Sequence, residues 1–469
     1  MRSFRVRAHQ KAAFGGCLWR AAVAGGVLAL GACATYLPLP LSQGQGVKDV
    51  SQLTVNAADM PLPALRTHPF DPSHGLDVTD VAMLAVVNNP DLRLLRDQLG
   101  IARAQAFAAG LLPDPQISIN REFLDHAQPG YTTSYAYGIS EDITSLLLRS
   151  TRKVAANGQA EQVNLQLLWA EWQTIAQARL LFNQVNSLRA QQRQLLGEQA
   201  ALAPIDAYVR DAYQDGNLTH DAASAGINAY ADASKRLSDV TVQLHQAEHD
   251  LRLLLGLAPD ASLDLVGAPF QASPSVEQVQ AALASLPQRR PDLLALQAGY
   301  KAQEAILRGA IRAQFPAVNL GVDRQSDNNG VLSHGINIGL TLPLFDRNRG
   351  NIRIETATRQ QLKDDYDDRL LTTRSDIAQL TADLETLGRQ RDQLQRQSIR
   401  MDEARRAADA AWQKGLIDWP TYLSIRANAL SADMDFIAAR DRQSQEAIAL
   451  QALLGDTDLQ PSPSANPKS

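Results

Sequence analysis

The pattern in this sequence that most resembles catalytic chemistry is a pair of histidines beside a glutamate. His245, Glu248 and His249 match the His-x-x-Glu-His arrangement, in which two histidines hold a zinc ion and the glutamate acts as a base. On a helix, residues four positions apart share one face. A catalytic zinc ion also needs a third protein ligand and a sheltered cavity, whereas this pattern directly follows Leu244 on the seam of a long predicted helix. We therefore favour a solvated helix face, and the alternatives are a weak surface metal site and a zinc hydrolase.

A second group of candidate residues is acidic and flanks Tyr366. We interpret this group as a solvated helix face, with an acidic band that lines a lumen as the alternative; its members are Asp364, Asp365, Asp367 and Asp368. The sequence contains no Gly-rich phosphate loop and no evident Ser/His/Asp arrangement. It therefore predicts a protein that is not an enzyme and that needs no cofactor and no metal site.

The first 32 residues are typical of a bacterial export signal. A basic leader precedes an apolar run at residues 21–30, and the run ends in Leu30-Gly31-Ala32-Cys33, which is similar to a lipoprotein cleavage site. We predict lipidation at Cys33, and the alternative is a plain signal peptide or membrane anchor. Removal of residues 1–32 deletes five basic and no acidic residues, so 45 basic and 50 acidic residues become 40 and 50, a net charge of about −10. This charge argues against a nucleic-acid partner.

The mature chain would contain no second cysteine, which excludes an internal disulfide and a cysteine-based zinc site. It also lacks a further apolar run of 18–20 residues that could form a membrane-spanning helix.

The longest helical pattern runs from about Gly350 to Lys414. Apolar residues recur along it at heptad spacing, which requires a partner helix; they are Ile377, Leu380, Leu384, Leu387, Leu394 and Met401. At 1.5 Å per residue such a helix would be roughly 90–100 Å long. Gly415 ends it and a second helical pattern follows Asp418, which predicts a very long hairpin with a tight tip.

Four shorter runs alternate between apolar and polar residues, at about 115–123, 131–140, 316–325 and 333–342. Their length of eight to ten residues suits a tilted strand in a membrane, and soluble hairpins are the alternative. The second half of the chain repeats the first. At an offset of 201 residues, Asn89-Pro90-Asp91 matches Arg290-Pro291-Asp292 and Gly138 matches Gly339, and near the tips the offset is 199. We expect a lipid-anchored extended arm at 33–76, repeats at 77–257 and 276–456, a linker at 258–275 and a disordered tail at 457–469.

Four strands cannot close a barrel in lipid, where open sheet edges are not tolerated. Three chains would supply twelve strands. The predicted fold is therefore mainly α with a small β part: duplicated helix-strand-strand-helix-helix halves that form a long coiled-coil helical barrel and a trimeric twelve-stranded membrane barrel.

Several motifs at these positions resemble the TolC family of outer-membrane efflux channels over about Asp77 to Gly455. They are the stretches 88–92 (Asn-Asn-Pro-Asp-Leu), 109–115 (Ala-Gly-Leu-Leu-Pro-Asp-Pro) and 340–350 (Leu-Thr-Leu-Pro-Leu-Phe-Asp-Arg-Asn-Arg-Gly), and the last two are most similar to the branch that exports cobalt, zinc and cadmium. The resemblance implies a homotrimer in outer-membrane lipid, with its helices in the periplasm. It also implies docking on a periplasmic adaptor protein and an inner-membrane pump of the resistance-nodulation-division type.

In this family docking occurs at the hairpin tips, which here are residues 216–219 (Gly216, Asn217, Leu218, Thr219) and 415–418 (Gly415, Leu416, Ile417, Asp418). Glycine permits the turns, Thr219 and Asp418 are suitable helix caps, and three apolar residues would be stranded at an exposed tip. The alternative is that the tips are connectors only. Thr421 and Ser424 occupy the positions where many family members carry an acidic ring at the periplasmic aperture, so this aperture is expected to lack that ring.

The predicted function is the outer-membrane channel of a tripartite efflux system that conducts heavy-metal cations or small toxic molecules passively. The alternative function is that of a structural coiled-coil envelope lipoprotein without a pore.

Overall fold

The computed structural model describes residues 36–41, 46–50, 53–123, 125, 130–271 and 274–455. The export signal, Cys33 and the tail at 457–469 lie outside the described residues. The chain divides into two units, residues 1–45 and residues 46–469, and all that follows concerns the second unit.

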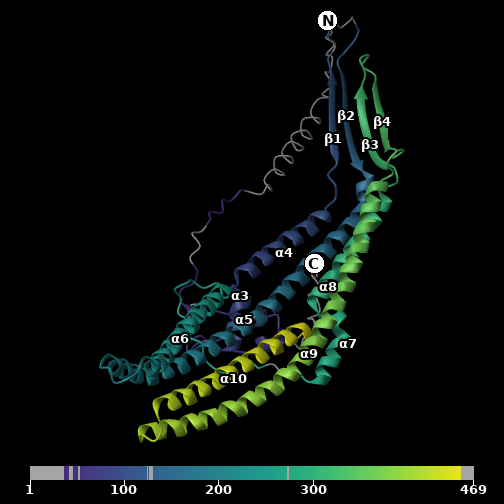
Figure 1. The fold of residues 1–469 in the computed structure, drawn as a ribbon. Coiled ribbons are helices and arrows are strands. Elements are labelled where there is room, and N and C mark those ends of the chain that lie inside the picture. The colour runs from purple at the N-terminus through teal and green to yellow at the C-terminus, as the bar shows by residue number, and fades with distance from the viewer. Residues whose placement is uncertain are drawn as a thin grey trace, which may run out of the picture. The chain divides into compact units, whose positions relative to one another are not determined.

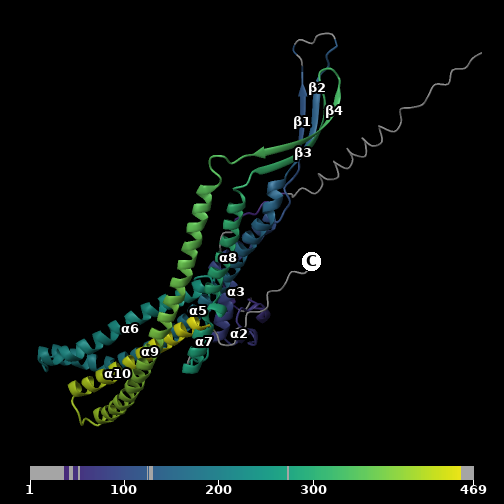
Figure 2. The same cartoon turned by 90° about the vertical axis from the view of Figure 1, so that its right-hand side faces the viewer.

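The second unit is mainly helical and its two halves have the same order of elements, as the repeat predicts (Figures 1 and 2). The first half contains η3 (Ala57–Asp59), α2 (Pro63–Arg66), α3 (Val78–Asn88), α4 (Pro90–Ala109), β1 (Gln116–Glu122), β2 (Ser134–Asp142), α5 (Ile143–Gln214) and α6 (His220–Leu254). The second half contains α7 (Val276–Arg289), α8 (Pro291–Arg312), β3 (Ala317–Ser326), β4 (Leu332–Thr341), α9 (Arg349–Gln413) and α10 (Trp419–Leu454).

Two very long helices connect the sheet to the hairpin tips. Helix α5 has 72 residues and α9 has 65, so at 1.5 Å per residue they are about 108 and 98 Å long. The predicted seam of α9 is confirmed, because Ile377 and Leu387 are buried and the other seam residues are half-buried. None of the helices that the structure describes is long and apolar enough to cross a membrane.

The four strands form one antiparallel sheet in the order β1-β2-β3-β4. The register places apolar residues opposite one another, for example Ile119 with Tyr137 and Leu320 with Ile338. Because side chains alternate along a strand, one face of the sheet is apolar and the other carries Gly, Ser, Asn and Asp. Within this chain β1 and β4 each pair with one neighbour, so both are edge strands.

Each half is held together in an equivalent way at the point where α4 or α8 begins. The side-chain amide of Asn89 donates to the carbonyl of Leu254 at the end of α6, with an N–O distance of 2.9 Å. In the second half Arg290 donates to the carbonyl of Leu453 at the end of α10, at 3.4 Å. Proline at the first helical position fixes both helix starts, so the repeat positions each returning helix against the base of its own half.

Residues 53–76 differ from the extended arm that the sequence predicts. They contain η3 and α2, and Met60 and Leu65 are almost completely buried against Met83 of α3. Apolar burial at irregular spacing gives this segment a defined place that periodicity alone does not reveal.

Candidate functional site: the hairpin tips and the network beside them

Both tips turn at a glycine with a positive φ angle, +73° at Gly216 and +66° at Gly415. After each glycine the chain folds back in the same way. The Asn217 N–H donates to the carbonyl of Ala212 at 2.8 Å, and the Leu416 N–H donates to the carbonyl of Ala411 at 2.9 Å. This is the usual way for a helix to end at a left-handed glycine, and it accounts for the glycine in each tip.

The returning helix α10 has the predicted cap. The Asp418 carboxylate accepts the N–H of Thr421 at 3.1 Å, and hydrogen bonds from the Thr421 side chain and backbone lower the pKa of Asp418. At the other tip the Thr219 carbonyl accepts the N–H of Ala223; a cap by the Thr219 side chain stays a prediction.

Only one of the three apolar tip residues is fully exposed. Leu416 has 72% of its surface accessible, whereas Leu218 and Ile417 are half-buried against an apolar cluster between the two hairpins. We call this the tip cluster; its buried members include Leu202, Val209, Tyr422 and Leu423. The expectation that all three residues are stranded was wrong for two of them, because Leu218 and Ile417 pack against the tip cluster.

Thr421 and Ser424 lie on the exposed side of α10, on either side of the buried Tyr422 and Leu423. Both side chains are exposed, and a position of these residues at a periplasmic aperture stays a prediction.

A buried charge network behind this turn joins the two hairpins. Arg426 of α10 makes a two-pronged ion pair with Glu198 of α5, with a shortest distance of 2.7 Å, and only 8% of each side chain is exposed. A third nitrogen of Arg426 donates to Asp409 of α9 at 2.8 Å and to the hydroxyl of Tyr422 at 3.1 Å. The Tyr422 hydroxyl donates to Asp409 at 2.9 Å.

The electrostatics of the network favour the ion pair. Burial opposes the positive charge of Arg426, but its hydrogen bonds and charge interaction with Glu198 outweigh that effect and raise the pKa of Arg426. Burial and the hydrogen bond to Asp409 raise the pKa of Tyr422, which stays neutral. Sequence reasoning missed this network, because Glu198 and Arg426 are 228 residues apart; the spacing of Tyr422 and Arg426 on one helix face was the available signal.

Comparisons with known proteins fit this geometry. The family model described as outer membrane efflux protein matches residues 282–456. The chain is 23% identical over 431 residues to the putative multidrug resistance outer membrane protein MdtQ of Shigella flexneri, covering 81% of this chain and 86% of MdtQ. It is 28% identical over 219 residues to outer membrane protein OprJ of Pseudomonas aeruginosa, and spans only 45% of that protein.

Solved structures share the fold. CusC superimposes with a TM-score of 0.65 at 18% identity, covering 85% of this chain and 97% of CusC. The outer-membrane channel OprN gives 0.67 at 17%, covering 90% and 99%.

Residues 282–456 therefore match the outer membrane efflux protein family, and most of the chain has the fold of solved outer-membrane channels.

This is a family of channel and transport components rather than of enzymes, and the histidine pattern on α6 fits that assignment. His245 and His249 are exposed, while Leu244 and Ala247 of the same helix are buried. Glu248 forms ion pairs with Arg189 at 2.8 Å and Arg252 at 3.5 Å. Glu248 therefore pairs with arginines of α5 and α6 and helps to hold these two helices together.

Proposed function

We propose that this efflux protein is the outer-membrane channel of a tripartite export system and works as a homotrimer. The observation that carries the proposal is the four-stranded sheet, which has one exposed apolar face, two open edges, and two very long helices leading away from it. A structural coiled-coil lipoprotein without a pore would need none of these strands.

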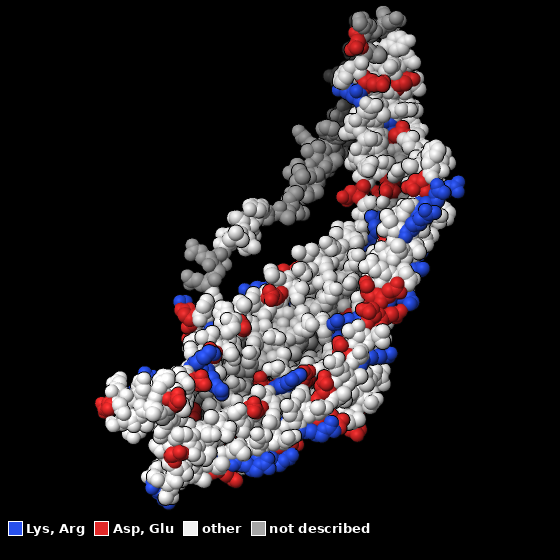
Figure 3. Space-filling model, viewed as in Figure 1, with Lys and Arg blue, Asp and Glu red and all other residues white. Residues whose placement is uncertain are grey.

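The apolar face of the sheet is exposed to an unusual degree for a single chain. The exposed fraction is 75% for Ile117, 74% for Ile336 and 65% for Ile338. In Figure 3 an uncharged band crosses the visible part of the sheet, and charged side chains gather where the sheet meets the helices. An apolar band between charged ends suits the hydrocarbon layer of a membrane.

The open edges suggest how many chains take part. Strands β1 and β4 could pair with their counterparts in neighbouring copies, and three copies would close twelve strands without an edge. The polar face, where Asn337 donates to Asp323 at 2.7 Å, would then line the lumen.

The internal repeat also identifies a contact between copies. Within the chain, α5 and α8 pack so tightly that a Cβ atom on Gly158 would lie 2.9 Å from the Cβ of Ala302. The offset of 199 residues takes Gly158 forward to Ala357 on α9. The offset of 201 residues takes Ala302 back to Ile101 on α4. Ile101 is 59% exposed and Ala357 is also exposed. We therefore infer that α9 of one copy packs on α4 of the next, as α5 packs on α8.

A disulfide experiment tests this assembly. In the Ile101→Cys, Ala357→Cys double variant, oxidation in outer membranes is expected to yield covalent trimers on non-reducing gels. The control pair is Ile101→Cys with Ile399→Cys, since Ile399 is 53% exposed but lies 42 residues along α9 from Ala357, about 60 Å. Equal linkage in both pairs, or linkage in neither, would reject the interface.

The proposed protein partners rest on the exposed hairpin tips and on the resemblance to the TolC family. We propose that the tips contact a periplasmic adaptor, with Leu416 as the most exposed apolar contact, and that the adaptor connects to a pump of the resistance-nodulation-division type. A photo-reactive side chain at Leu416 should capture the adaptor in cells with a functional pump. Failure to capture it while export continues would remove this part of the proposal.

We also propose lipidation at Cys33 and a position in the outer membrane with the helices in the periplasm. The substrates would be heavy-metal cations or small toxic molecules. MdtQ is described as a multidrug resistance protein, whereas the motifs at 109–115 and 340–350 favour metals, so survival of a deletion strain on cobalt, zinc, cadmium and drugs decides between them. Absence of conductance in planar bilayers would support the pore-free alternative.

A further inference from the structure

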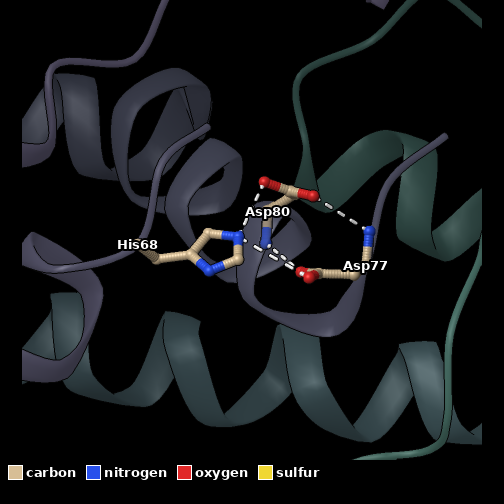
Figure 4. A group of neighbouring side chains, drawn as sticks. All are labelled: His68, Asp77 and Asp80. Atoms are coloured by element: carbon tan, nitrogen blue, oxygen red, sulfur yellow. Dashed lines mark hydrogen bonds and ion pairs between the residues drawn. The ribbon is translucent and has the colours of Figure 1, made fainter. Parts of the chain in front are cut away.

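Three side chains with metal-binding atoms meet beside the start of α3, far along the chain from the histidines of α6. They are His68, from the loop after α2, Asp77, the residue that caps the start of α3, and Asp80, from the first turn of α3 (Figure 4). The ring nitrogen Nε2 of His68 lies 3.2 Å from Oδ1 of Asp80 and 3.6 Å from Oδ2 of Asp77. One ligand atom from each residue falls within 4.8 Å of the other two.

Backbone hydrogen bonds hold both carboxylates in this orientation. Oδ1 of Asp77 accepts the N–H groups of Thr79 and Asp80, at 2.7 and 2.8 Å. Oδ2 of Asp80 accepts the N–H of Asp77 at 3.1 Å. This reciprocal cap uses one oxygen of each carboxylate and needs no histidine. The second oxygen of each carboxylate points to the same place, the Nε2 atom of His68.

Two carboxylates so close together, one of them buried, need positive charge. Only 5% of Asp80 is exposed. The imidazole of His68 can supply at most one positive charge, whereas a divalent cation at the meeting point of the three atoms would neutralise both carboxylates.

We propose that His68, Asp77 and Asp80 bind one divalent transition-metal ion, with Zn²⁺ as the best fit. Bonds of 2.0–2.2 Å in a tetrahedral site place neighbouring ligand atoms about 3.3–3.6 Å apart, and the two distances from His68 are 3.2 and 3.6 Å. An imidazole nitrogen with two carboxylate oxygens suits zinc, cobalt or nickel better than magnesium or calcium. Water would complete the coordination.

The ion would act as a clamp rather than as a catalyst. It would fix the loop after α2 to the start of α3, next to the apolar cluster in which Leu62 and Leu65 pack on Met83 and Trp172. Residues 53–76 lead from the N-terminal part of the chain to this helix, so the clamp would hold that segment on the helical unit. This site is independent of the proposed channel function, because it needs neither the sheet nor the tips.

Zinc titration of the full-length protein in detergent, stripped with a chelator and without an affinity tag, tests the proposal. Isothermal calorimetry with zinc chloride is expected to show one ion per chain with a dissociation constant in the micromolar range or below. The variants His68→Gln and Asp80→Asn should bind at least tenfold more weakly. Both keep a hydrogen-bonding group at the same position, so the cap and the loop are retained.

The control variant is His249→Ala, which removes one histidine of the exposed α6 pattern and should bind zinc like the parent. Zinc should raise the melting temperature of the parent and of His249→Ala but not of His68→Gln. No saturable binding, binding unchanged in His68→Gln, or binding lost in His249→Ala would each overturn the proposal.

Discussion

Replacing Arg426 by methionine should loosen the contact between the two hairpins more than any other single surface or seam change near the tips. Methionine fills similar space but leaves the carboxylate of Glu198 buried without its partner. The hydrogen bonds from Arg426 to Asp409 and to Tyr422 disappear at the same time. The change therefore removes the only positive charge that contacts Glu198 in the part of the chain that the structure describes.

The expected magnitude follows from the burial of the pair. Removing one partner of a buried ion pair costs about 3–5 kcal/mol, which corresponds to an opening equilibrium shifted about 100- to 4,000-fold. An exposed pair provides the matched control. Arg389 and Glu385 lie 3.0 Å apart on α9 with 70% and 74% of their side chains exposed, so Arg389→Met should cost about 0–1 kcal/mol.

Hydrogen exchange of the full-length protein measures this opening, because global unfolding of a membrane assembly is seldom reversible. Amides around Tyr422 and Asp409 should lose protection in Arg426→Met and keep it in Arg389→Met. Adding Glu198→Gln to Arg426→Met removes the unpaired charge and should recover at least about 1.5 kcal/mol. Equal loss in the two arginine variants, or no recovery in the double variant, would refute the reasoning.

Three further changes test other parts of the structure. Ile338→Asp on the apolar face of the sheet should block membrane assembly, whereas Asn337→Asp on the polar face should assemble normally; heat-stable oligomers on gels measure this. For Asp292, burial raises the pKa, but Arg290 and Arg369 outweigh it and lower the pKa, so its contribution to stability is present above about pH 4 and lost as the pH falls below that value. The melting-temperature difference between the parent and Asp292→Asn should therefore shrink from pH 6 to pH 3, and a constant difference would contradict the assignment. Gly415→Ala should destabilise its hairpin by about 1 kcal/mol, because the φ angle of +66° strains alanine, whereas Gly197→Ala in the interior of α5 should stabilise by about 0.5–1 kcal/mol; melting curves compare the two.

The parts of the fold with a regular period were predictable from the sequence. The heptad seam located α9 to within a residue at each end, and alternation located all four strands to within a few residues. The duplication also predicted that both halves share one order of elements. These features depend on local spacing, which a single sequence displays directly.

The parts that depend on contacts between distant residues were not predictable. Glu198 and Arg426 belong to different repeats, and nothing local marks Glu198 as buried. Leu218 and Ile417 looked exposed because a tip is usually exposed, but the tip cluster covers them. The meeting of His68 with Asp77 and Asp80 depends on how an aperiodic segment folds onto α3.

A comparison of the two long helices gives the strongest physical reason to expect assembly. Helix α5 lies between α4 and α8 and has nineteen buried residues among 72. Helix α9 is its counterpart in the repeat, and α8 packs on it as α4 packs on α5, but α9 has no counterpart of the α8 that packs on the other side of α5, and it has four buried residues among 65. A helix of about 98 Å with so few buried residues is poorly stabilised by its own chain, because most helical stability in proteins comes from packing. The neighbour that α5 has and α9 lacks is α8, whose equivalent in the repeat is α4, and α4 of the next chain in a ring would fill that place.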